Sequence, residues 1–150
     1  MPVALTMKLV KAISYCVALV MLSSHAVAEV RSVFIQSRLD FNAILITEVD
    51  VVFVYDQSIV DNFPATKTAW YSNKREFLEE AGDRLDLVSV FVPQGFDSDM
   101  ASLPQRRADA LKVFVFGQHD SSTRPPIDVT DYENVLVEID QFGILVSQRN

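Results

Sequence analysis

The sequence predicts a mainly β protein, a β-sandwich with one or two short helices. Residues 29–150 divide into short extended runs that are rich in β-branched and aromatic side chains and bounded by polar turn residues. One stretch between the second and third runs has helical periodicity instead. Six strands with short helices between them favour a sandwich with additions. A three-layer α/β domain with a thioredoxin-like order of elements is the alternative.

Six strands are expected along the chain. The run 49–56 is β-branched and aromatic-rich between acidic residues, which predicts a central, well-buried strand. The run 85–92 stops at the turn signal Pro93-Gln94-Gly95. The last two runs are joined by Asp140-Gln141-Phe142-Gly143, which predicts a hairpin. In order, the expected strands are 32–38, 49–56, 85–92, 111–116, 135–139 and 144–146.

The stretch 61–82 is the predicted helix. Pro64 is suited to open it and Gly82 to close it. Trp70, Phe77, Leu78 and Ala81 stand at offsets 0, 7, 8 and 11, which places them on one face of a helix. A second short helix is expected over 100–109.

The N-terminal residues 1–28 have the pattern of a secretory signal peptide. Lys8 and Lys11 precede an apolar run, 13–22, and the segment closes on Ala26-Val27-Ala28. The run is about ten residues long, against the ~20 that a transmembrane helix needs. We therefore expect a leader over 1–28 and one periplasmic domain over 29–150; the true start, Met1 or Met7, stays open.

Removal of the leader leaves a chain that is poor in reactive side chains. It takes away Cys16, the only cysteine, and leaves 11 basic against 20 acidic side chains, a net charge of −9. Such a surface repels phosphate backbones and argues against nucleic acid. Thiol chemistry and thiolate metal sites are excluded, and no cofactor is expected. Contact with a membrane is expected to be indirect unless Cys16 carries a lipid, a role disfavoured by Tyr15 before it and the apolar run after it.

His119 is the one histidine of the expected mature chain, and it stands beside Asp120, Ser121 and Ser122. A hydrolase or metal enzyme centred on His119 is conceivable from these residue types. However, no Gly-x-Ser-x-Gly elbow is present, and polar neighbours are typical of a solvated loop. We therefore expect no enzyme activity.

Two further groups of residues are expected to be structural. Asp97-Ser98-Asp99 resembles the start of a calcium loop but lacks its glycine and glutamate, so we expect it to cap the helix 100–109. The phenylalanines inside strand runs are expected in the core; they are Phe34, Phe53, Phe91, Phe114 and Phe116. Phe41 differs because it lies in a turn, where an apolar ring either folds back onto the core or faces a partner.

The order of these motifs gives a family resemblance. Leu39-Asp40-Phe41-Asn42 is followed by Val51-Val52-Phe53-Val54-Tyr55, by Lys74-Arg75-Glu76-Phe77-Leu78 with Ala81-Gly82, by the apolar run 111–116, and by the closing segment 135–144. Over most of residues 38–147 the chain resembles the TssJ-like (SciN/VasD) outer-membrane lipoproteins of the type VI secretion system.

The resemblance implies a transthyretin-like β-sandwich with a small helical addition. It implies a non-enzymatic component of a secretion-system membrane complex that binds the periplasmic domain of an inner-membrane protein through the loop after the first strand. In this chain that loop is 40–47, and the partner-binding residues would be Asp40, Phe41, Asn42 and Ile44. The family pattern makes 74–80 a strand, whereas helix propensity makes it a helix.

Three departures from the family pattern are visible. The expected mature chain has no cysteine to carry a lipid, the loop after the first strand is short, and so is the insertion between the second and third strands. A small periplasmic binding or inhibitor module unrelated to secretion, which would use the loop 118–126, is therefore the alternative function.

Overall fold

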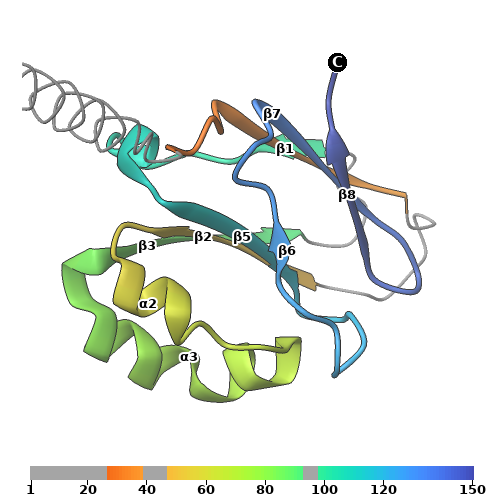
Figure 1. The fold of residues 1–150 in the computed structure, drawn as a ribbon. Helices are drawn as coiled ribbons and strands as arrows, with labels where there is room; N and C mark the ends of the chain where they lie inside the picture. Colours follow the sequence, from red (N-terminus) through yellow and green to blue (C-terminus); the bar gives the residue numbers. More distant parts are fainter. Residues whose placement is uncertain (1–26, 39–46, 93–97) are drawn as a thin grey trace, which may run out of the picture.

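The computed structural model describes residues 27–38, 47–92 and 98–150. These residues form two four-stranded sheets packed face to face, with helices on the outer side of one sheet (Figure 1). The strand orders are β4-β1-β7-β8 and β3-β2-β5-β6. The predicted β-sandwich is confirmed. The thioredoxin-like alternative is wrong, because the strands divide between two sheets and do not form one central sheet.

All six predicted strands are present, with bounds within two residues of the prediction. The strands are β1 (Ser32–Ser37), β2 (Thr47–Val54), β3 (Leu85–Val92), β4 (Ser98–Met100), β5 (Lys112–Gly117), β6 (Ile127–Asp128), β7 (Asn134–Ile139) and β8 (Ile144–Gln148). The predicted hairpin is confirmed, since β7 and β8 pair antiparallel. β1 pairs in parallel with β7. The additional strands β4 and β6 are only three and two residues long.

The helical stretch is divided in two, α2 (Gln57–Asp61) and α3 (Lys67–Ala81). Pro64 lies between the helices and does not open α3, which is capped by Thr66: its hydroxyl accepts the N–H of Ala69 at 3.1 Å. Gly82 ends α3 as predicted, with φ of +56°. Residues 74–80 are therefore helical. The short 3-10 helix η1 (Gly82–Arg84) leads into β3.

β2 is the central element, and all eight of its residues are buried. Alternate side chains of β2 lie in two different cores, because one face of the strand packs against the other sheet and the opposite face packs against α3. Val49, Val51 and Phe53 belong to the core between the sheets. Val52 and Val54 belong to the core under the helices, with Trp70, Ala81, Phe77 and Leu78 from the predicted apolar face of α3.

The predicted helix over 100–109 is wrong. Residues 98–100 form β4, and the N–H of Ala101 donates to the carbonyl of Val33 at 3.0 Å, so this part of the chain extends the first sheet. Pro104 follows, and only the 3-10 helix η2 (Arg107–Asp109) forms beyond it. Ser98 therefore begins a strand, and the helix-capping role expected for Asp97-Ser98-Asp99 is also wrong.

The expectation that all five strand phenylalanines lie in the core is wrong for Phe91 and Phe34. Phe34 is half-buried and belongs to neither core, and the guanidinium of Arg149 lies 4.4 Å from the centre of its ring. Phe53 and Phe116 are buried, whereas the Phe91 side chain is 66% exposed. Val88, Val90 and Val92 of the same strand pack against the core between the sheets. Because side chains alternate along a strand, Phe91 points to the opposite face.

Ala28, the last residue of the predicted leader, makes contacts with the domain in the full-length chain. Ala28 is buried, and its N–H donates to the carbonyl of Ala110 at 2.9 Å; the N–H of Glu29 donates to the carbonyl of Thr130 at 3.0 Å. Ala28 and Val30 thus belong to the packed core. Among the described residues, no helix is long and apolar enough to cross a membrane.

Candidate functional site at one end of the sandwich

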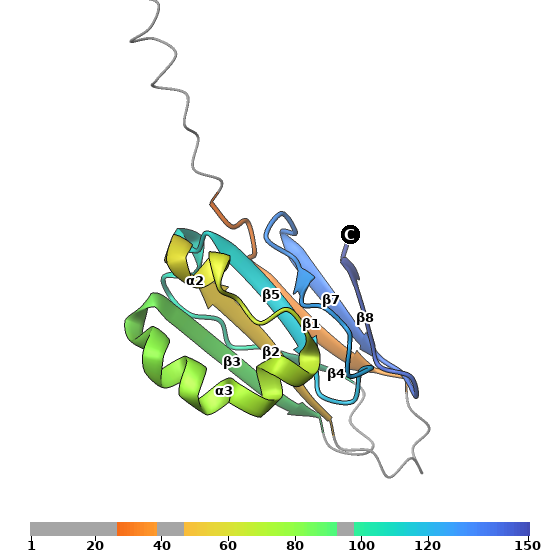
Figure 2. The ribbon, with the colours of Figure 1, turned by 60° about the horizontal axis from the view of Figure 1, so that its bottom comes forward.

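The ends of several strands meet at one end of the sandwich, which we call the loop end (Figure 2). The start of β2 lies opposite the end of β3, with Thr47 paired to Val92, and the end of β5 reaches the same level at Gly117, which lies opposite Val49. In the other sheet β1 and β7 end side by side. Loops held on a rigid sandwich are the usual place for binding residues.

The predicted partner-binding residues stand in the sequence between β1 and β2. Asp40, Phe41, Asn42 and Ile44 lie outside the described residues, which contain only the two flanks of the predicted loop. Both flanks are held by contacts. At the first, the N–H of Arg38 donates to the carbonyl of Ile139 at 2.8 Å and its guanidinium pairs with Glu138.

The second flank is held by a histidine bridge. Thr47 is buried at 1% exposure, and its hydroxyl lies 2.7 Å from Nδ1 of His119. Nε2 of His119 lies 2.9 Å from the carbonyl oxygen of Asp140, in the β7–β8 turn. A carbonyl only accepts, so Nε2 carries the hydrogen and Nδ1 of the neutral ring accepts from Thr47. His119 therefore connects the start of β2 in one sheet to the hairpin of the other.

This geometry does not provide a nucleophile and base pair at His119. Nδ1 faces the hydroxyl of Thr47, which is 1% exposed and therefore out of reach of a substrate, and Nε2 faces a backbone carbonyl. The hydroxyl of Ser121 lies 3.4 Å from that of Thr123 instead. Among the described residues there is also no cluster of three or more histidine, cysteine or acidic side chains placed to hold a metal.

The loop 118–126 contacts both the start of β8 and the start of α3. Oδ1 of Asp120 accepts the N–H of Ile144 at 2.9 Å, and Arg124 donates to the carbonyl of Ile144 at 3.3 Å. On the other side, the carbonyl of Arg124 accepts the N–H of Lys67 at 2.7 Å, at the start of α3. Gly143 permits the approach of Asp120, because a Cβ there would lie 1.9 Å from Oδ1. His119, Asp120 and Arg124 are thus engaged in internal contacts, whereas Gln118 and the run 121–123 are exposed.

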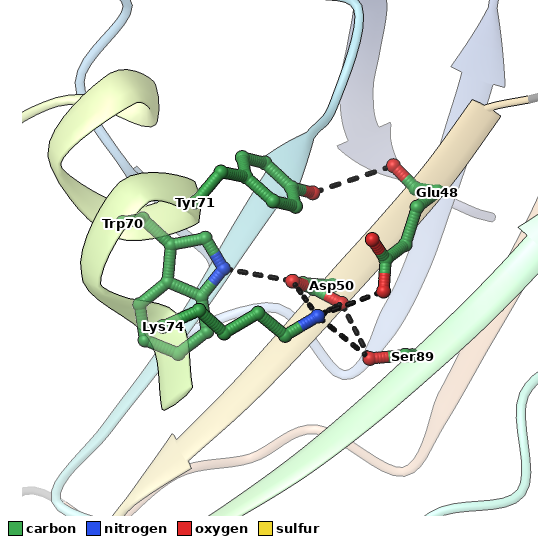
Figure 3. Close-up of polar contacts among 6 residues, drawn as sticks. All are labelled: Glu48, Asp50, Trp70, Tyr71, Lys74 and Ser89. Atoms are coloured by element: carbon green, nitrogen blue, oxygen red, sulfur yellow. Dashed lines mark hydrogen bonds and ion pairs between the residues drawn. The ribbon is translucent and has the colours of Figure 1, made fainter. Parts of the chain in front are cut away.

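A second polar feature, the α3–β2 polar cluster, lies under the first half of α3. It consists of Glu48, Asp50, Trp70, Tyr71, Lys74 and Ser89 (Figure 3). Nζ of Lys74 lies 2.7 Å from Oε1 of Glu48 and 2.9 Å from Oδ2 of Asp50. Asp50 is completely buried, and it also accepts hydrogen bonds from the indole of Trp70 at 2.7 Å and the hydroxyl of Ser89 at 2.6 Å.

The surroundings of Lys74 and Tyr71 in this cluster raise the pKa of both groups. Burial alone would lower the pKa of Lys74, but the hydrogen bonds and charges of Asp50 and Glu48 outweigh burial and raise the pKa above its usual value. Burial, followed by the charge of Asp50, raises the pKa of Tyr71 well above its usual range. An ammonium and a neutral phenol are poor bases and nucleophiles at neutral pH. The ion pairs and hydrogen bonds of the cluster hold α3 on the sheet.

Sequence reasoning missed both the histidine bridge and the α3–β2 polar cluster. A signal for the second was present, because Glu48 and Asp50 stand two apart in an otherwise apolar strand and must therefore share one face. No comparable signal pointed to the bridge, since Thr47, His119 and Asp140 are far apart in the chain.

No family model matches the sequence, and no curated protein matches it significantly. Two solved structures that resemble this one in shape are components of type VI secretion systems, the machinery to which the resembled lipoprotein family belongs. One is Lip of Serratia marcescens, a membrane-bound component of the system, with 12% identity over 79% of this chain and 96% of that one and a TM-score of 0.49. The other is the lipoprotein TssJ1 of Pseudomonas aeruginosa, with 11% identity over 79% and 95% and a TM-score of 0.47.

Proposed function

We propose that this protein is a non-enzymatic structural component of a type VI secretion membrane complex. In this proposal it binds the periplasmic domain of an inner-membrane secretion protein through the loop 40–47 at the loop end. The proposal rests on the sequence motifs that resemble the TssJ-like family, together with the β-sandwich that the resemblance implies.

The observation that best supports the choice of loop is the fixing of its two flanks. Arg38 is tied to β7 by a backbone hydrogen bond and an ion pair. Thr47 is tied through His119 to the β7–β8 turn. A short segment whose ends are held on a rigid scaffold loses little conformational freedom on binding, which favours affinity. An apolar ring with a polar neighbour, as in Phe41 and Asn42, suits the centre of a protein interface.

Substitution of the loop residues tests this proposal. Phe41→Ala and Asn42→Ala are each expected to weaken binding at least ~30-fold, the scale of an interface hot spot. The measurement is titration calorimetry with the purified periplasmic domain of the inner-membrane protein of the same type VI secretion system. Phe142→Ala is the matched control, because it removes another ring at the loop end, 79% exposed, and we expect less than about threefold loss. Intact binding by both loop variants would overturn the loop assignment.

The proposed location is the periplasm, with association to the outer membrane through partners. We expect the mature chain to begin at Glu29, because Ala26-Val27-Ala28 has the small residues that signal peptidase requires. Intact mass measurement of the protein from a periplasmic extract tests this. An acylated Cys16 would instead establish a direct membrane anchor, and an uncleaved chain in the cytosol would contradict the proposed location.

A further inference from the structure

The open edge of β3 is an unusual feature of this sandwich. β3 is the outer strand of its sheet and pairs, within the described chain, only with β2. The N–H of Tyr55 donates to the carbonyl of Arg84, so these two residues form a hydrogen-bonded pair at the end of the ladder between β2 and β3. In an antiparallel ladder every second residue is bonded to the neighbouring strand, and the backbone groups of the residues between them point the other way. The backbone groups of Val88 and Val90 therefore face β2, and those of Leu87, Ser89 and Phe91 face outward.

The other sheet edges in the described residues are shorter than β3, and one of them is partly covered. β4 and β6 have three and two residues. β8 has five, and the outward N–H and carbonyl of its first residue, Ile144, are bonded to the side chains of Asp120 and Arg124. β3 has eight residues, and it contains no lysine, no proline and no bulge, three of the devices that protect natural edges.

The only charged side chain of β3, that of Asp86, is held by contacts with residues outside the strand. Asp86 accepts two hydrogen bonds from the guanidinium of Arg106, at 2.8 and 2.9 Å, and one from the hydroxyl of Tyr55 at 2.8 Å. These contacts lie toward the start of β3. The remaining residues, 87–92, are uncharged, and the ring of Phe91, next to the end of the strand, is exposed.

The position of this edge connects it to the proposed binding loop. Phe91 is paired with Glu48 and Val92 with Thr47, so the exposed half of β3 ends beside the residue at which the loop 40–47 joins the sheet. A partner that contacts the loop is therefore within reach of the outward backbone groups of β3. The net charge of −7 of the chain favours a segment with basic residues.

We propose that β3 takes up an extended segment of the partner's periplasmic domain as an added strand. This inference rests on the proposed function and specifies how the partner binds. The added strand would pair with the outward N–H and carbonyl groups of Leu87, Ser89 and Phe91, which gives affinity through the backbone. The Phe91 ring would pack on an apolar side chain of that strand, and basic residues would flank it.

Amide hydrogen exchange tests the proposal directly. In the free protein the amides of Leu87, Ser89 and Phe91 are expected to exchange quickly, whereas those of Val88 and Val90 are protected by β2. Addition of the purified periplasmic domain is expected to slow the three outward amides by about tenfold or more. The outward amides of Val146 and Gln148 in β8 are the internal control and are expected to keep their rates.

Substitutions at Phe91 separate backbone pairing from ring contact. Phe91→Ala removes the ring, and Phe91→Pro also removes the outward N–H while leaving the ladder to β2 intact. We expect the proline variant to bind about threefold to tenfold more weakly than the alanine variant. Phe91→Lys, which leaves the outward N–H in place, is expected to weaken binding more than Leu145→Lys, its counterpart on β8.

The outcomes that overturn the inference are distinct from those that overturn the function. Tight binding with unchanged exchange at Leu87, Ser89 and Phe91 overturns the added strand and leaves the proposed function standing. Protection that appears without the partner and grows with protein concentration assigns the edge to a second copy of this chain and also overturns the inference. Absence of any binding by the wild-type protein overturns both.

Discussion

Lys74→Met is expected to destabilise the protein by about 3–5 kcal/mol, because it leaves two buried carboxylates without their cation. Asp50 is fully buried and Glu48 nearly so, and Nζ of Lys74 is the charged donor that both share. A loss of this size is a large part of the ~5–15 kcal/mol that holds a typical domain together. Urea unfolding at neutral pH measures it.

The pH dependence of the wild-type protein provides a second measurement of the same contact. The pKa of Lys74 is raised in the folded state, so its stabilising contribution is complete below the unfolded-state pKa of ~10.4. The contribution is lost as the pH rises through the higher folded-state value. Lys74→Met is expected to lack this alkaline loss.

Arg75→Met is the matched control for this prediction. Arg75 is the next residue of the same helix, and its side chain is 94% exposed, so its removal is expected to change the free energy of unfolding by less than about 0.5 kcal/mol. A loss below about 1 kcal/mol for Lys74→Met would contradict the structural role of the α3–β2 polar cluster.

Trp70→Ala is the second substitution with a large expected effect, also about 3–5 kcal/mol. The indole is completely buried between α3 and the sheet. It lies nearly parallel to the ring of Phe116, with centroids 5.2 Å apart, and stacks on Phe63 at 5.8 Å. Truncation would open a cavity in the core under the helices and remove the hydrogen bond to Asp50.

Trp70→Phe separates these two effects. It keeps an aromatic ring in the core but removes the N–H that Asp50 accepts, so we expect a smaller loss of about 1–3 kcal/mol. Thermal and urea unfolding of both variants measure the order. Equal losses would show that the hydrogen bond and not the packing dominates, and a loss below 1 kcal/mol for Trp70→Ala would show that the helical layer is not firmly attached.

These two predictions bear on the proposed interface as well as on stability. The cores on the two faces of β2 and the α3–β2 polar cluster hold the helices firmly against one sheet. In the proposed function, the partner is then bound by the loop end and by the edge of β3. Core substitutions are expected to reduce binding only through unfolding, whereas Phe41→Ala and Phe91→Pro are expected to reduce binding by the folded protein.

Much of the fold could be predicted from local patterns. The run 85–92 became β3 with the same bounds, because an alternating segment that ends at Pro93 has few other options. The apolar face of α3 was predicted from the spacing of Trp70, Phe77, Leu78 and Ala81. The helix expected over 100–109 failed because its start, 98–101, pairs with β1 and Pro104 interrupts the remainder.

The sequence by itself determined the class of fold, the order of its main strands and the apolar face of its helix, since each depends on the periodicity of neighbouring residues. Only the tertiary structure decided that Lys74 would join Glu48 and Asp50, that His119 would bridge Thr47 and Asp140, and that Phe91 would end an open edge. These features depend on which distant segments meet and which face each presents, and short-range periodicity carries no information on either.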